Sequence, residues 1–467
     1  MGSPSEKKTN LLFPVETINR ELDFRLFLAA KCATANNRIF IGQHDLLYRL
    51  SKYAPGGVYI GKNLFLLEFP LATLERYQTI KQRGITFIHL DDEGAIYVGG
   101  PDDWRRALDA RLDPTVLAAD DYVCTWGDFQ RDYFRSKNPR CAPNIRTTGH
   151  PRFDLCTPRY RSYFDDEVEG IRRRFGRFVL LNTNLTYGNN ALGLVDTFSL
   201  RNGWDPDSAP RRKRFMDAYV HTVKILLGFV SVMHTLSVEL PHLNFVLRPH
   251  PLEDRSYYEH IFRAIKNVHV LHEGGVNPWL LACQAMIHDG CTTGVEGQLA
   301  GTPLVNYKSV ELFEHDLFLP NIFGIQTRTE AETVDAVRAI TSGGLPAAPE
   351  VRDADALSLL ANLERTSFEP FLEVLAEAEA SRSVTRSAFD ERAFLRADAA
   401  RRAADVGRAV ARRFSPARAK WHAALRLAFY GFDKADLARR IAKVERVVGK
   451  RLSWRFYGPE LFTVEDA

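Results

Sequence analysis

Short apolar runs recur along this 467-residue chain, and stretches of helical periodicity separate them. In the first 150 residues these runs are 38–41, 57–60, 85–90 and 122–124. Farther along they are 178–181, 244–247, 268–271, 285–288 and 303–306. Strands that alternate with helices at this spacing are typical of parallel sheets covered by helices on both faces. The pattern therefore predicts an α/β fold built from doubly wound, Rossmann-like domains.

The length of the chain exceeds what one hydrophobic core usually organises, so we expect two domains and a terminal extension. We place an N-terminal α/β domain at residues 1–172 and a second α/β domain at 173–345, with a cleft between them. Residues 346–467 are rich in alanine, arginine and glutamate, which predicts a helical extension that packs back on the N-terminal domain. Residues 190–210 lack clear periodicity and are predicted to form a loop over the cleft.

The composition is that of an ordinary globular protein, with 45% hydrophobic and 26% charged residues. The six cysteines lie far apart without a CxxC pair. This spacing argues against a zinc ribbon or a disulfide framework and favours a reducing compartment. Residues 1–10 are polar, and we found no apolar run of about 18 residues, so neither a signal peptide nor a spanning helix is predicted. We expect a cytoplasmic protein.

Positive charge is concentrated at the C-terminal end of the chain. Residues 381–467 hold 20 Lys and Arg against 10 Asp and Glu, a balance of +10, so the overall +4 leaves −6 for the preceding residues. An anionic partner would be met in this extension. No basic and aromatic interleaving accompanies the arginines, so nucleic acid is not predicted. The basic helices, including the apolar and basic run 421–430, either form a solvated, packed surface or contact the inner face of the cytoplasmic membrane.

The first motif that suggests chemistry is Arg248-Pro249-His250-Pro251, directly after the apolar run 243–247. Its position puts an arginine and a histidine at the carboxyl end of a buried strand, where ligands of open α/β sheets bind. An arginine beside a histidine favours a phosphate group. The alternative for His250 is a strand-end histidine bonded to a backbone carbonyl.

A second motif, residues 288–294 with the sequence His-Asp-Gly-Cys-Thr-Thr-Gly, follows another apolar run and precedes a helix-like segment. Backbone amides and hydroxyl groups at a helix start form an anion site, and Gly290 and Gly294 allow close backbone approach. Thr292 and Thr293 would contribute hydroxyls, although both could simply cap the helix. Glu296, about one helical turn beyond Thr292, is a candidate acceptor for ribose hydroxyls.

Asparagines stand at the end of the first strand expected in the second domain. Asn182 and Asn184 are candidate contacts for sugar or phosphate oxygens. Equally, asparagine and threonine at this place can close the turn after the strand. Together with the two motifs, these side chains point to a binding site for an activated phosphate compound.

Several blocks of the chain resemble a known family when they are taken together and in order. The blocks are 91–94, 124–127 with Gln130, 148–154, 180–184, 248–251 and 289–307. They resemble the bacterial surface carbohydrate biosynthesis proteins and, through them, the capsule and O-antigen transferases that use CMP-Kdo. A more distant similarity links them to transferases that polymerise polyglycerol phosphate and sialic acid. Singly, each block is weakly specific.

The resemblance implies a GT-B architecture, in which residues 1–172 form the acceptor-side domain and residues 173–345 bind the nucleotide sugar. In this group an HP dipeptide and a later hydroxyl pair hold the donor phosphate, which corresponds here to His250-Pro251 and Thr292-Thr293. The implied function is transfer of an acidic sugar such as Kdo from its CMP donor to a glycan or lipid-linked glycan acceptor during synthesis of capsule or lipopolysaccharide O-antigen. A protein of this kind could also be peripheral on the inner membrane surface.

The resemblance to β-Kdo transferases also implies retention of configuration through an aspartyl-sugar adduct. We assign Asp154 as the nucleophile and Glu93 as acid or base toward the acceptor hydroxyl. His150 and Arg152 are candidate sugar contacts in the same block. Alternatively, Asp154 is a helix cap or an ion-pair partner of a neighbouring arginine, and residues 91–94 are an acidic turn. An inverting mechanism would need only one base, and the sequence leaves the two outcomes open.

No metal and no cofactor are predicted. The histidines show no metal-ligand spacing, and a CMP-sugar already carries its leaving group. Two other functions remain open at this point. One is a transferase of the same architecture that uses a UDP- or GDP-sugar or CDP-glycerol, and the other is a non-catalytic or epimerase-like protein of GT-B form.

Overall fold

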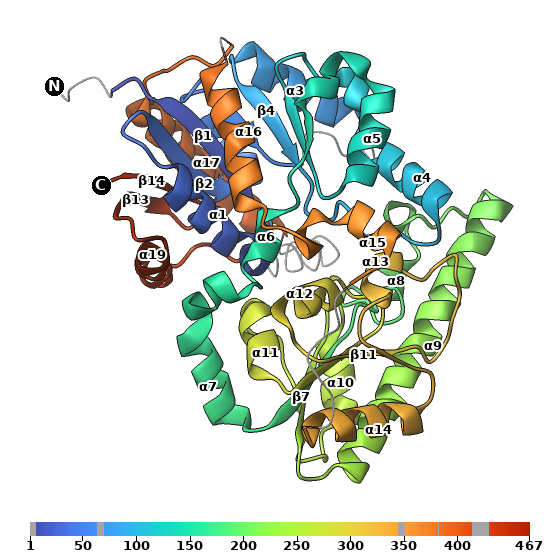
Figure 1. Ribbon diagram of the computed structural model, residues 1–467. Helices are drawn as coiled ribbons and strands as arrows, with labels where there is room; N and C mark the ends of the chain where they lie inside the picture. Colours follow the sequence, from blue (N-terminus) through green and yellow to red (C-terminus); the bar gives the residue numbers. More distant parts are fainter. Residues whose placement is uncertain (1–5, 63–69, 344–350, 382, 413–428) are drawn as a thin grey trace. The chain divides into compact units, whose positions relative to one another are not determined.

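The computed structural model describes residues 6–62, 70–343, 351–381, 383–412 and 429–467. The chain divides into two compact units. Unit 1 comprises Met1–Ala95, Arg105–Leu155 and Asp353–Ala467, and unit 2 comprises Ile96–Trp104 and Cys156–Arg352. Each unit contains its own sheet with helices packed around it (Figure 1). The predicted fold class, α/β with two doubly wound domains and a largely helical C-terminal region, is confirmed.

Sheet 1, in unit 1, has eight strands in the order β13-β14-β2-β1-β3-β4-β5-β6. The strands are β1 Thr9–Val15, β2 Asn37–Gln43, β3 Val58–Ile60, β4 Thr86–Leu90, β5 Tyr122–Thr125, β6 Ile145–Thr147, β13 Leu452–Gly458 and β14 Leu461–Asp466. Strands β1 to β6 are parallel. The order β2-β1-β3-β4-β5 is the flavodoxin-like one, whose switch point lies between β1 and β3. The four strands predicted for this part of the chain are present as β2 to β5.

The helices of unit 1 cover both faces of sheet 1 and come from both ends of the sequence. They are α1 Ile18–Cys32, α2 His44–Leu50, α3 Pro70–Gln82, α4 Pro101–Arg111, α5 Asp128–Lys137, α6 Pro151–Asp154, α15 Ala354–Leu359, α16 Phe368–Ala380, α17 Glu391–Arg412 and α19 Lys434–Val448, with the 3-10 helices η1 Pro114–Val116, η2 Pro139–Asn144 and η5 Ala361–Leu363. Helix α4 begins in unit 2 and ends in unit 1. Helix α1 packs against both α16 and α19, so the C-terminal helices complete the N-terminal unit.

The C-terminal extension differs from the prediction in its last part. Residues 346–467 were expected to be helical, but β13 and β14 form an antiparallel hairpin whose strand β14 pairs with the edge strand β2. Residues 452–458 and 461–466 are therefore strands, and the helical prediction for them is wrong. The reason is tertiary: β2 offers an open edge, and the side chains of Leu461, Phe462 and Val464 are fully buried against it. Most of the run 421–430 lies outside the described residues.

Sheet 2, in unit 2, has six parallel strands in the order β12-β11-β10-β7-β8-β9. The strands are β7 Phe178–Asn182, β8 Asn244–Arg248, β9 Val268–Val270, β10 Ala285–His288, β11 Leu304–Tyr307 and β12 Ile325–Thr327. This order is that of the dinucleotide-binding fold, and its switch point lies between β7 and β10. The five strands predicted for this part are present as β7 to β11. Strand β12 was not predicted, and neither were β1 and β6 of sheet 1.

The helices of unit 2 are α7 Asp165–Phe175, α8 Leu194–Thr197, α9 Ala209–Glu239, α10 Arg255–Ile261, α11 Asn277–Ala282, α12 Thr292–Ala300, α13 Phe318–Asn321 and α14 Glu330–Thr341, with η3 Pro158–Phe164 and η4 Leu200–Asn202. The unit begins earlier than the predicted boundary at residue 173. Helix α7 packs on α11, where the rings of Phe175 and Trp279 lie 5.7 Å apart. Residues 96–104 also belong to this unit, because Trp104 packs on Phe318.

Helix α9 is long and apolar enough, by length and composition, to cross a membrane, and 33% of that stretch is buried. The sequence prediction concerned an unbroken apolar run, which α9 does not contain, so this helix does not contradict it. One face of the helix, including Ile225, Phe229 and Met233, forms part of the core of unit 2. Core helices of folded domains pass the same test of length and composition. Within the predicted loop 190–210, α8 and η4 are short helices, α9 begins at Ala209, and the other residues are irregular.

Candidate functional site

The carboxyl edge of sheet 2 brings together three of the predicted donor-binding segments. Asn182 ends β7, Arg248 ends β8 and His288 ends β10. Strand β7 pairs with both β8 and β10, so the segments that follow these three strands are neighbours. Helix α12 begins at Thr292, just after β10. The switch point between β7 and β10 is thus lined by Asn182 and the segment 288–294, as the sequence predicts.

Several buried polar atoms at this edge have no hydrogen-bond partner within the described part of the chain. They are Asn182 Oδ1, both ring nitrogens of His288, Asp289 Oδ2 and Asn306 Oδ1. Burial lowers the pKa of His288 to about 3, so its ring is neutral at physiological pH. Buried polar groups in native proteins almost always have partners. Their concentration at a topological switch point is what a site built around a polar ligand would show.

Helix α12 presents its first turn at this switch point. Its N-cap is Cys291, whose side chain makes no capping bond, so Thr292 and Thr293 lie inside the first turn and are half-buried. The capping alternative for these two threonines is therefore not what the structure shows. The first backbone N–H groups of a helix lack intrahelical partners and favour an anion. Glu296 is buried one turn farther on.

Gly294 has a different role from the predicted one. A Cβ atom at this position would lie 2.6 Å from Cε1 of His288, which is closer than real Cβ contacts. The glycine allows α12 to pack on the His288 ring, and its own N–H bonds the Cys291 carbonyl. Gly290 has φ +60, a conformation that favours glycine, and its N–H donates to Asn321 Oδ1 at 2.7 Å.

His250 is held by the loop that it belongs to. Its Nδ1 accepts a hydrogen bond from the Leu252 N–H at 3.2 Å, so the neutral ring carries its proton on Nε2. Thr186 Oγ1 lies 3.4 Å from the same nitrogen. These contacts of Nδ1 do not decide between the predicted phosphate contact and a bond to a backbone carbonyl. Pro251 forms the turn between His250 and α10.

Glu253 joins the loops after β7 and β8, and the sequence analysis did not identify it. Its Oε1 accepts from Thr183 Oγ1 at 2.8 Å and from the N–H groups of Leu185 and His250, each at 3.0 Å. Tyr258 donates to Oε2 at 2.7 Å. Burial raises the pKa of Glu253, although these hydrogen bonds oppose the shift. The signal in the sequence was an acidic residue three positions after His250.

Arg248 positions a neighbouring loop. Its guanidinium donates to the carbonyls of Gly274 at 3.1 Å and Gly275 at 3.4 Å, and it stacks over Trp279. Burial lowers its pKa to about 9, so the group stays charged at neutral pH. It contributes positive charge, while its hydrogen bonds to Gly274 and Gly275 go to the protein and not to an open site. Asn184, in contrast, is exposed in the loop after β7.

A buried ion pair lies beside the switch point and was also missed. Lys308 follows β11, and its Nζ lies 3.5 Å from Asp289 Oδ1 and 3.0 Å from Asp316 Oδ2. Burial raises the pKa of Asp289 to about 6, although Lys308 opposes the shift. His221 on α9 contacts Asp316 at 3.1 Å. In the sequence, Lys308 could have been found as the first charged residue after the apolar run that forms β11.

The carboxyl edge of sheet 1 carries a network of paired charges. Lys62 follows β3, and its Nζ lies 3.2 Å from Glu16 Oε2, after β1, and 3.2 Å from Asp92 Oδ2, after β4. His150 donates from Nε2 to Asp92 Oδ1 at 3.1 Å, because its Nδ1 accepts from the Arg152 N–H. Burial alone would raise the pKa of Asp92, but Lys62 and His150 hold it well below its ordinary value. His150 and Arg152 are both buried in this network.

Glu93 lies at the accessible rim of the same network, with 44% of its side chain exposed. Its Oε1 is 3.1 Å from Arg20, and its Oε2 is 3.3 Å from Arg111. Burial raises its pKa, but Lys62, Arg20 and Arg111 outweigh this and lower it to about 2. Glu93 is therefore an ionised carboxylate that solvent reaches. Glu16 and Lys62 were not predicted, because β1 was not recognised and Lys62 follows a strand of only three residues.

Asp154, the predicted nucleophile, is buried, whereas Glu93 is partly exposed. It is 1% exposed, and its two oxygens accept hydrogen bonds from the N–H groups of Ser367 and Phe368 and from Asn362 Nδ2. Burial raises its pKa to about 7 against the effect of these bonds. The carboxylate caps the N-terminus of α16. This geometry favours the capping alternative, with the correction that the capped helix is distant in sequence.

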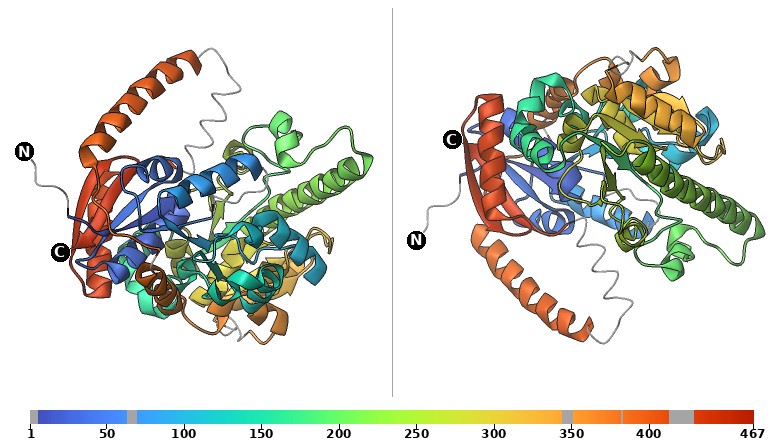
Figure 2. Two further views of the ribbon diagram at one scale, coloured as in Figure 1. Left: turned by 90° about the horizontal axis from the view of Figure 1, so that it is seen from above. Right: turned by 90° about the horizontal axis from the view of Figure 1, so that it is seen from below.

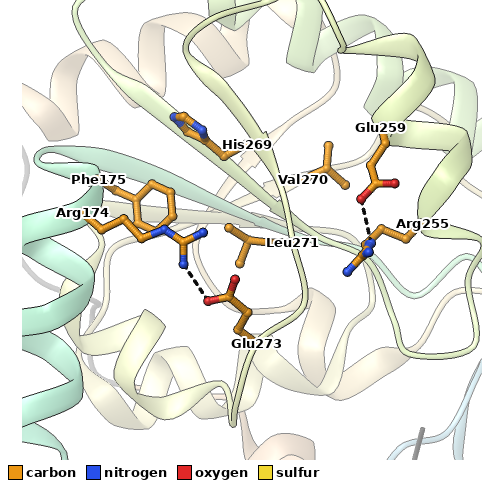
Figure 3. Close-up of a pocket in the computed structure, with 8 residues that line it drawn as sticks. All are labelled: Arg174, Phe175, Arg255, Glu259, His269, Val270, Leu271 and Glu273. Carbon is orange, nitrogen blue, oxygen red and sulfur yellow. Dashed lines mark hydrogen bonds and ion pairs between the residues drawn. The ribbon is translucent and has the colours of Figure 1, made fainter.

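A separate hollow of about 470 Å³ opens at the β9 edge of unit 2 (Figure 3). It is lined by Arg174, Phe175, Arg255, Glu259, His269, Val270, Leu271 and Glu273. Its two arginines each bond a glutamate, with Arg174–Glu273 at 2.7 Å and Arg255–Glu259 at 2.8 Å. None of the predicted site residues lines it. Among the described residues, no group of three or more His, Cys, Asp or Glu side chains is arranged to hold a metal ion.

No protein-family model matches the chain, and neither does any curated protein. Among solved structures it is similar to the UDP-GlcNAc 2-epimerase from Neisseria meningitidis bound to UDP-GlcNAc, with 12% identity and a TM-score of 0.46 over 79% of this chain and 100% of that one. It is also similar to the wall teichoic acid polymerase TagF, with 11% identity and a TM-score of 0.45 over 80% of this chain and 89% of that one. A third similar structure is S. aureus MnaA with UDP, with 9% identity and a TM-score of 0.41 over 79% of this chain and 95% of that one. Likenesses this distant assign neither a family nor an activity.

Proposed function

We propose that this chain is a glycosyltransferase that binds the phosphate of a nucleotide-sugar donor at the carboxyl edge of sheet 2. The observation that carries the proposal is the group of partnerless buried polar atoms of Asn182, His288 and Asp289 at the switch point, beside the first turn of α12. Helix N-termini favour anions through their N–H groups and their dipole. A phosphate linked to a ribose and a sugar supplies both the anion and the hydroxyls that such a site requires.

The donor that we propose is a CMP-linked acidic sugar such as Kdo. The support is the ordered set of sequence blocks, which includes His250-Pro251, in the loop after β8, and Thr292-Thr293, in the first turn of α12. A CMP-sugar has one phosphate, which suits the single short helix start at α12. Such a transfer uses no cofactor, and the product would be a bacterial surface glycan. UDP- or GDP-sugars and CDP-glycerol are the competing donors.

For the chemistry at the sugar carbon we assign the role of base toward the acceptor to Glu93. Its carboxylate is ionised and partly exposed, so it can accept the proton of an acceptor hydroxyl as that oxygen attacks the anomeric carbon. The bond that breaks in this step is the one to the donor phosphate in an inverting reaction, and the one to the aspartyl oxygen in a retaining reaction. A retaining reaction through an aspartyl-sugar adduct on Asp154 would require that carboxylate to leave the amides of α16. The retaining mechanism is therefore tested directly through the adduct.

The donor test is calorimetric titration of the full chain with CMP, UDP, GDP and CDP, followed by CMP-Kdo and UDP-GlcNAc. We expect CMP to bind, and Thr292→Ala to weaken that binding about tenfold through loss of one hydrogen bond to a charged group. The matched control is Thr79→Ala, whose hydroxyl bonds within α3 and which should bind CMP as the parent does. Binding of UDP in place of CMP would select the competing donors.

The mechanism test uses intact mass after incubation with CMP-Kdo. If the reaction is retaining, a variant that blocks turnover of the adduct, such as Glu93→Gln, should gain the mass of one sugar residue. If Asp154 is the nucleophile, Asp154→Asn should gain no sugar mass. If another residue is the nucleophile, Asp154→Asn can still gain it. Failure of every variant and of the parent to bind any of the nucleotides would contradict the transferase proposal and favour a non-catalytic protein.

A further inference from the structure

Helix α9 is longer than the sheet it covers. Its 31 residues span about 46 Å, whereas the strands of sheet 2 have three to five residues and span at most about 17 Å. The α9 residues in the core of unit 2 run from Ile225 to Leu236. The N-terminal half of the helix therefore extends past its own sheet, and Figure 2 shows this green helix and the neighbouring loop projecting together. We call residues 190–220 the α8–α9 knob.

The knob has a small aromatic core of its own. The ring of Phe198 lies 5.2 Å from Trp204, 5.4 Å from Phe215 and 5.0 Å from Tyr219. Trp204 and Phe215 also contact each other at 5.5 Å. Aromatic contacts of this kind stabilise a fold beyond the burial of area alone. The loop that carries α8 is thus anchored on the first turns of α9.

The outer surface of the knob exposes aliphatic side chains. Leu194 and Val195 in α8 are 61% and 90% exposed, and Leu200 in η4 is 77% exposed. Single exposed apolar residues are ordinary, but three of them within seven positions of an anchored, projecting segment point to an interaction surface. Met216 and Val220, on the part of α9 that projects, are also exposed.

Four consecutive basic residues, 211–214, lie on the first turn of α9. Arg211 pairs with Asp205, and Lys213 pairs with Asp217. Residues 194–220 contain five Lys or Arg and four Asp, a balance of +1. The charge of the knob therefore favours an anionic partner only modestly, and the exposed aliphatic groups are its main feature.

From these observations we propose that the α8–α9 knob docks on a phospholipid bilayer that carries anionic headgroups. Leu194, Val195 and Leu200 enter the boundary between headgroups and acyl chains, and the basic first turn of α9 faces the lipid phosphates. Insertion of aliphatic side chains combined with basic residues is the usual chemistry of interfacial binding. This proposal is independent of the proposed function, and it places membrane contact in unit 2, not in the C-terminal basic helices.

The test is co-sedimentation of the full chain with vesicles of phosphatidylcholine mixed with phosphatidylglycerol, and with vesicles of phosphatidylcholine alone. The parent should bind the mixed vesicles, and the variant Leu194→Ser/Val195→Ser/Leu200→Ser should bind at least about tenfold more weakly, since it loses most of the inserted apolar surface. The matched control, Val238→Ser/Leu252→Ser, changes aliphatic residues of the same unit that are 60% and 41% exposed and should bind like the parent. Lys213→Glu/Arg214→Glu should weaken binding to the mixed vesicles only, in a salt-dependent way.

If the triple variant folds poorly, a second measurement tests membrane contact of the knob without it. Val195→Cys labelled with an environment-sensitive fluorophore should shift to the blue on addition of mixed vesicles, and the same label at position 238 should not. Equal binding by the parent and the triple variant, or no binding by the parent, overturns the proposal. So does a parent dimer in sedimentation velocity that the triple variant dissociates, because the knob would then be an interface between copies of the chain.

Discussion

The carboxyl edges of the two sheets occupy the same topological position but treat their polar groups in opposite ways. In sheet 1 the carboxylates of Glu16 and Asp92 both face Lys62. In sheet 2 the side chains of Asn182 and His288 hold buried atoms that have no partner within the described residues. At the first edge the carboxylates are paired with cations of the chain, whereas the second is the edge at which we propose that a ligand binds. Substitutions at the first edge should therefore lower the free energy of unfolding, whereas a ligand that binds at the second edge should raise it.

The largest expected effect is the loss of Lys62 from the sheet 1 network. Lys62→Met leaves Glu16 and Asp92 without their shared cation, and removing one partner of a buried pair costs about 3–5 kcal/mol. The measurement is the free energy of unfolding from chemical denaturation. Lys213→Met is the control, because its exposed pair with Asp217 should contribute little to the free energy of unfolding. Equal losses in the two variants would show that the sheet 1 network is no more than a surface feature.

Nucleotide binding should stabilise the sheet 2 edge by a somewhat smaller amount. A ligand at about 100 times its dissociation constant raises the free energy of unfolding by about 2.7 kcal/mol. We expect CMP to shift the melting temperature of the parent upward and to leave that of Thr292→Ala less changed at the same concentration. Thermal unfolding followed by fluorescence measures the shift. A CMP shift that survives unchanged in Thr292→Ala would place the nucleotide elsewhere.

A pair of glycine substitutions compares the switch point with an ordinary helix surface. Gly294→Ala pushes a Cβ into the His288 ring and should destabilise the chain by about 1–3 kcal/mol through overpacking, with weaker CMP binding. Gly170→Ala in α7 has open space around it and should stabilise by about 0.5–1 kcal/mol through helix propensity. Denaturation curves of the two variants give both values. A stabilising Gly294→Ala would mean that α12 has room to move away from His288.

Asp154 should behave as a helix cap. Asp154→Ala removes the acceptor for the first amides of α16 and should cost about 1–2 kcal/mol. Its folded-state pKa of about 7 lies above the ordinary 3.8, so between these pH values the folded state binds more protons than the unfolded state. The unfolding free energy of the parent therefore falls as pH rises from about 4 to 7, and Asp154→Ala lacks this contribution.

Unfolding measured at pH 5 and at pH 8 checks this sign. The matched control is Asp433→Ala, which removes the exposed N-cap of α19 and should lose a similar free energy. A full loss of transfer activity in an Asp154→Asn variant that is as stable as the parent would argue instead for the catalytic role.

Much of the fold was predictable because it depends on local patterns. Nine of the predicted apolar runs are strands, since a buried parallel strand is a continuous apolar run that needs no distant partner to be recognised. Strand β1 was not predicted at all, and its polar start includes Asn10, which bonds the Pro55 carbonyl and Ser387. The hairpin of β13 and β14 was missed because its burial depends on the open edge of β2, more than 400 residues earlier.

The candidate site was predictable in position but not in detail. A strand end followed by polar residues identifies the carboxyl edge of a sheet, so Asn182, Arg248 and the segment 288–294 came together as expected. The contacts of each side chain were not predictable. Arg248 turns to the loop after β9. Glu253 and Lys308, which organise the neighbouring loops, belong to neither of the two predicted phosphate motifs.

By itself, the sequence determined the alternation of strand and helix, the two α/β units and the polar segments at the strand ends, because periodicity and burial act over short stretches of chain. Only the tertiary structure decided which charges were paired and which buried atoms stayed without a partner. Asp154 is the clearest case: its neighbours in sequence allow a nucleophile or a cap, and the amides that bind it come from residues more than 200 positions away. Hydrogen bonds act at about 3 Å, so the role of such a side chain depends on which distant backbone the fold brings to it.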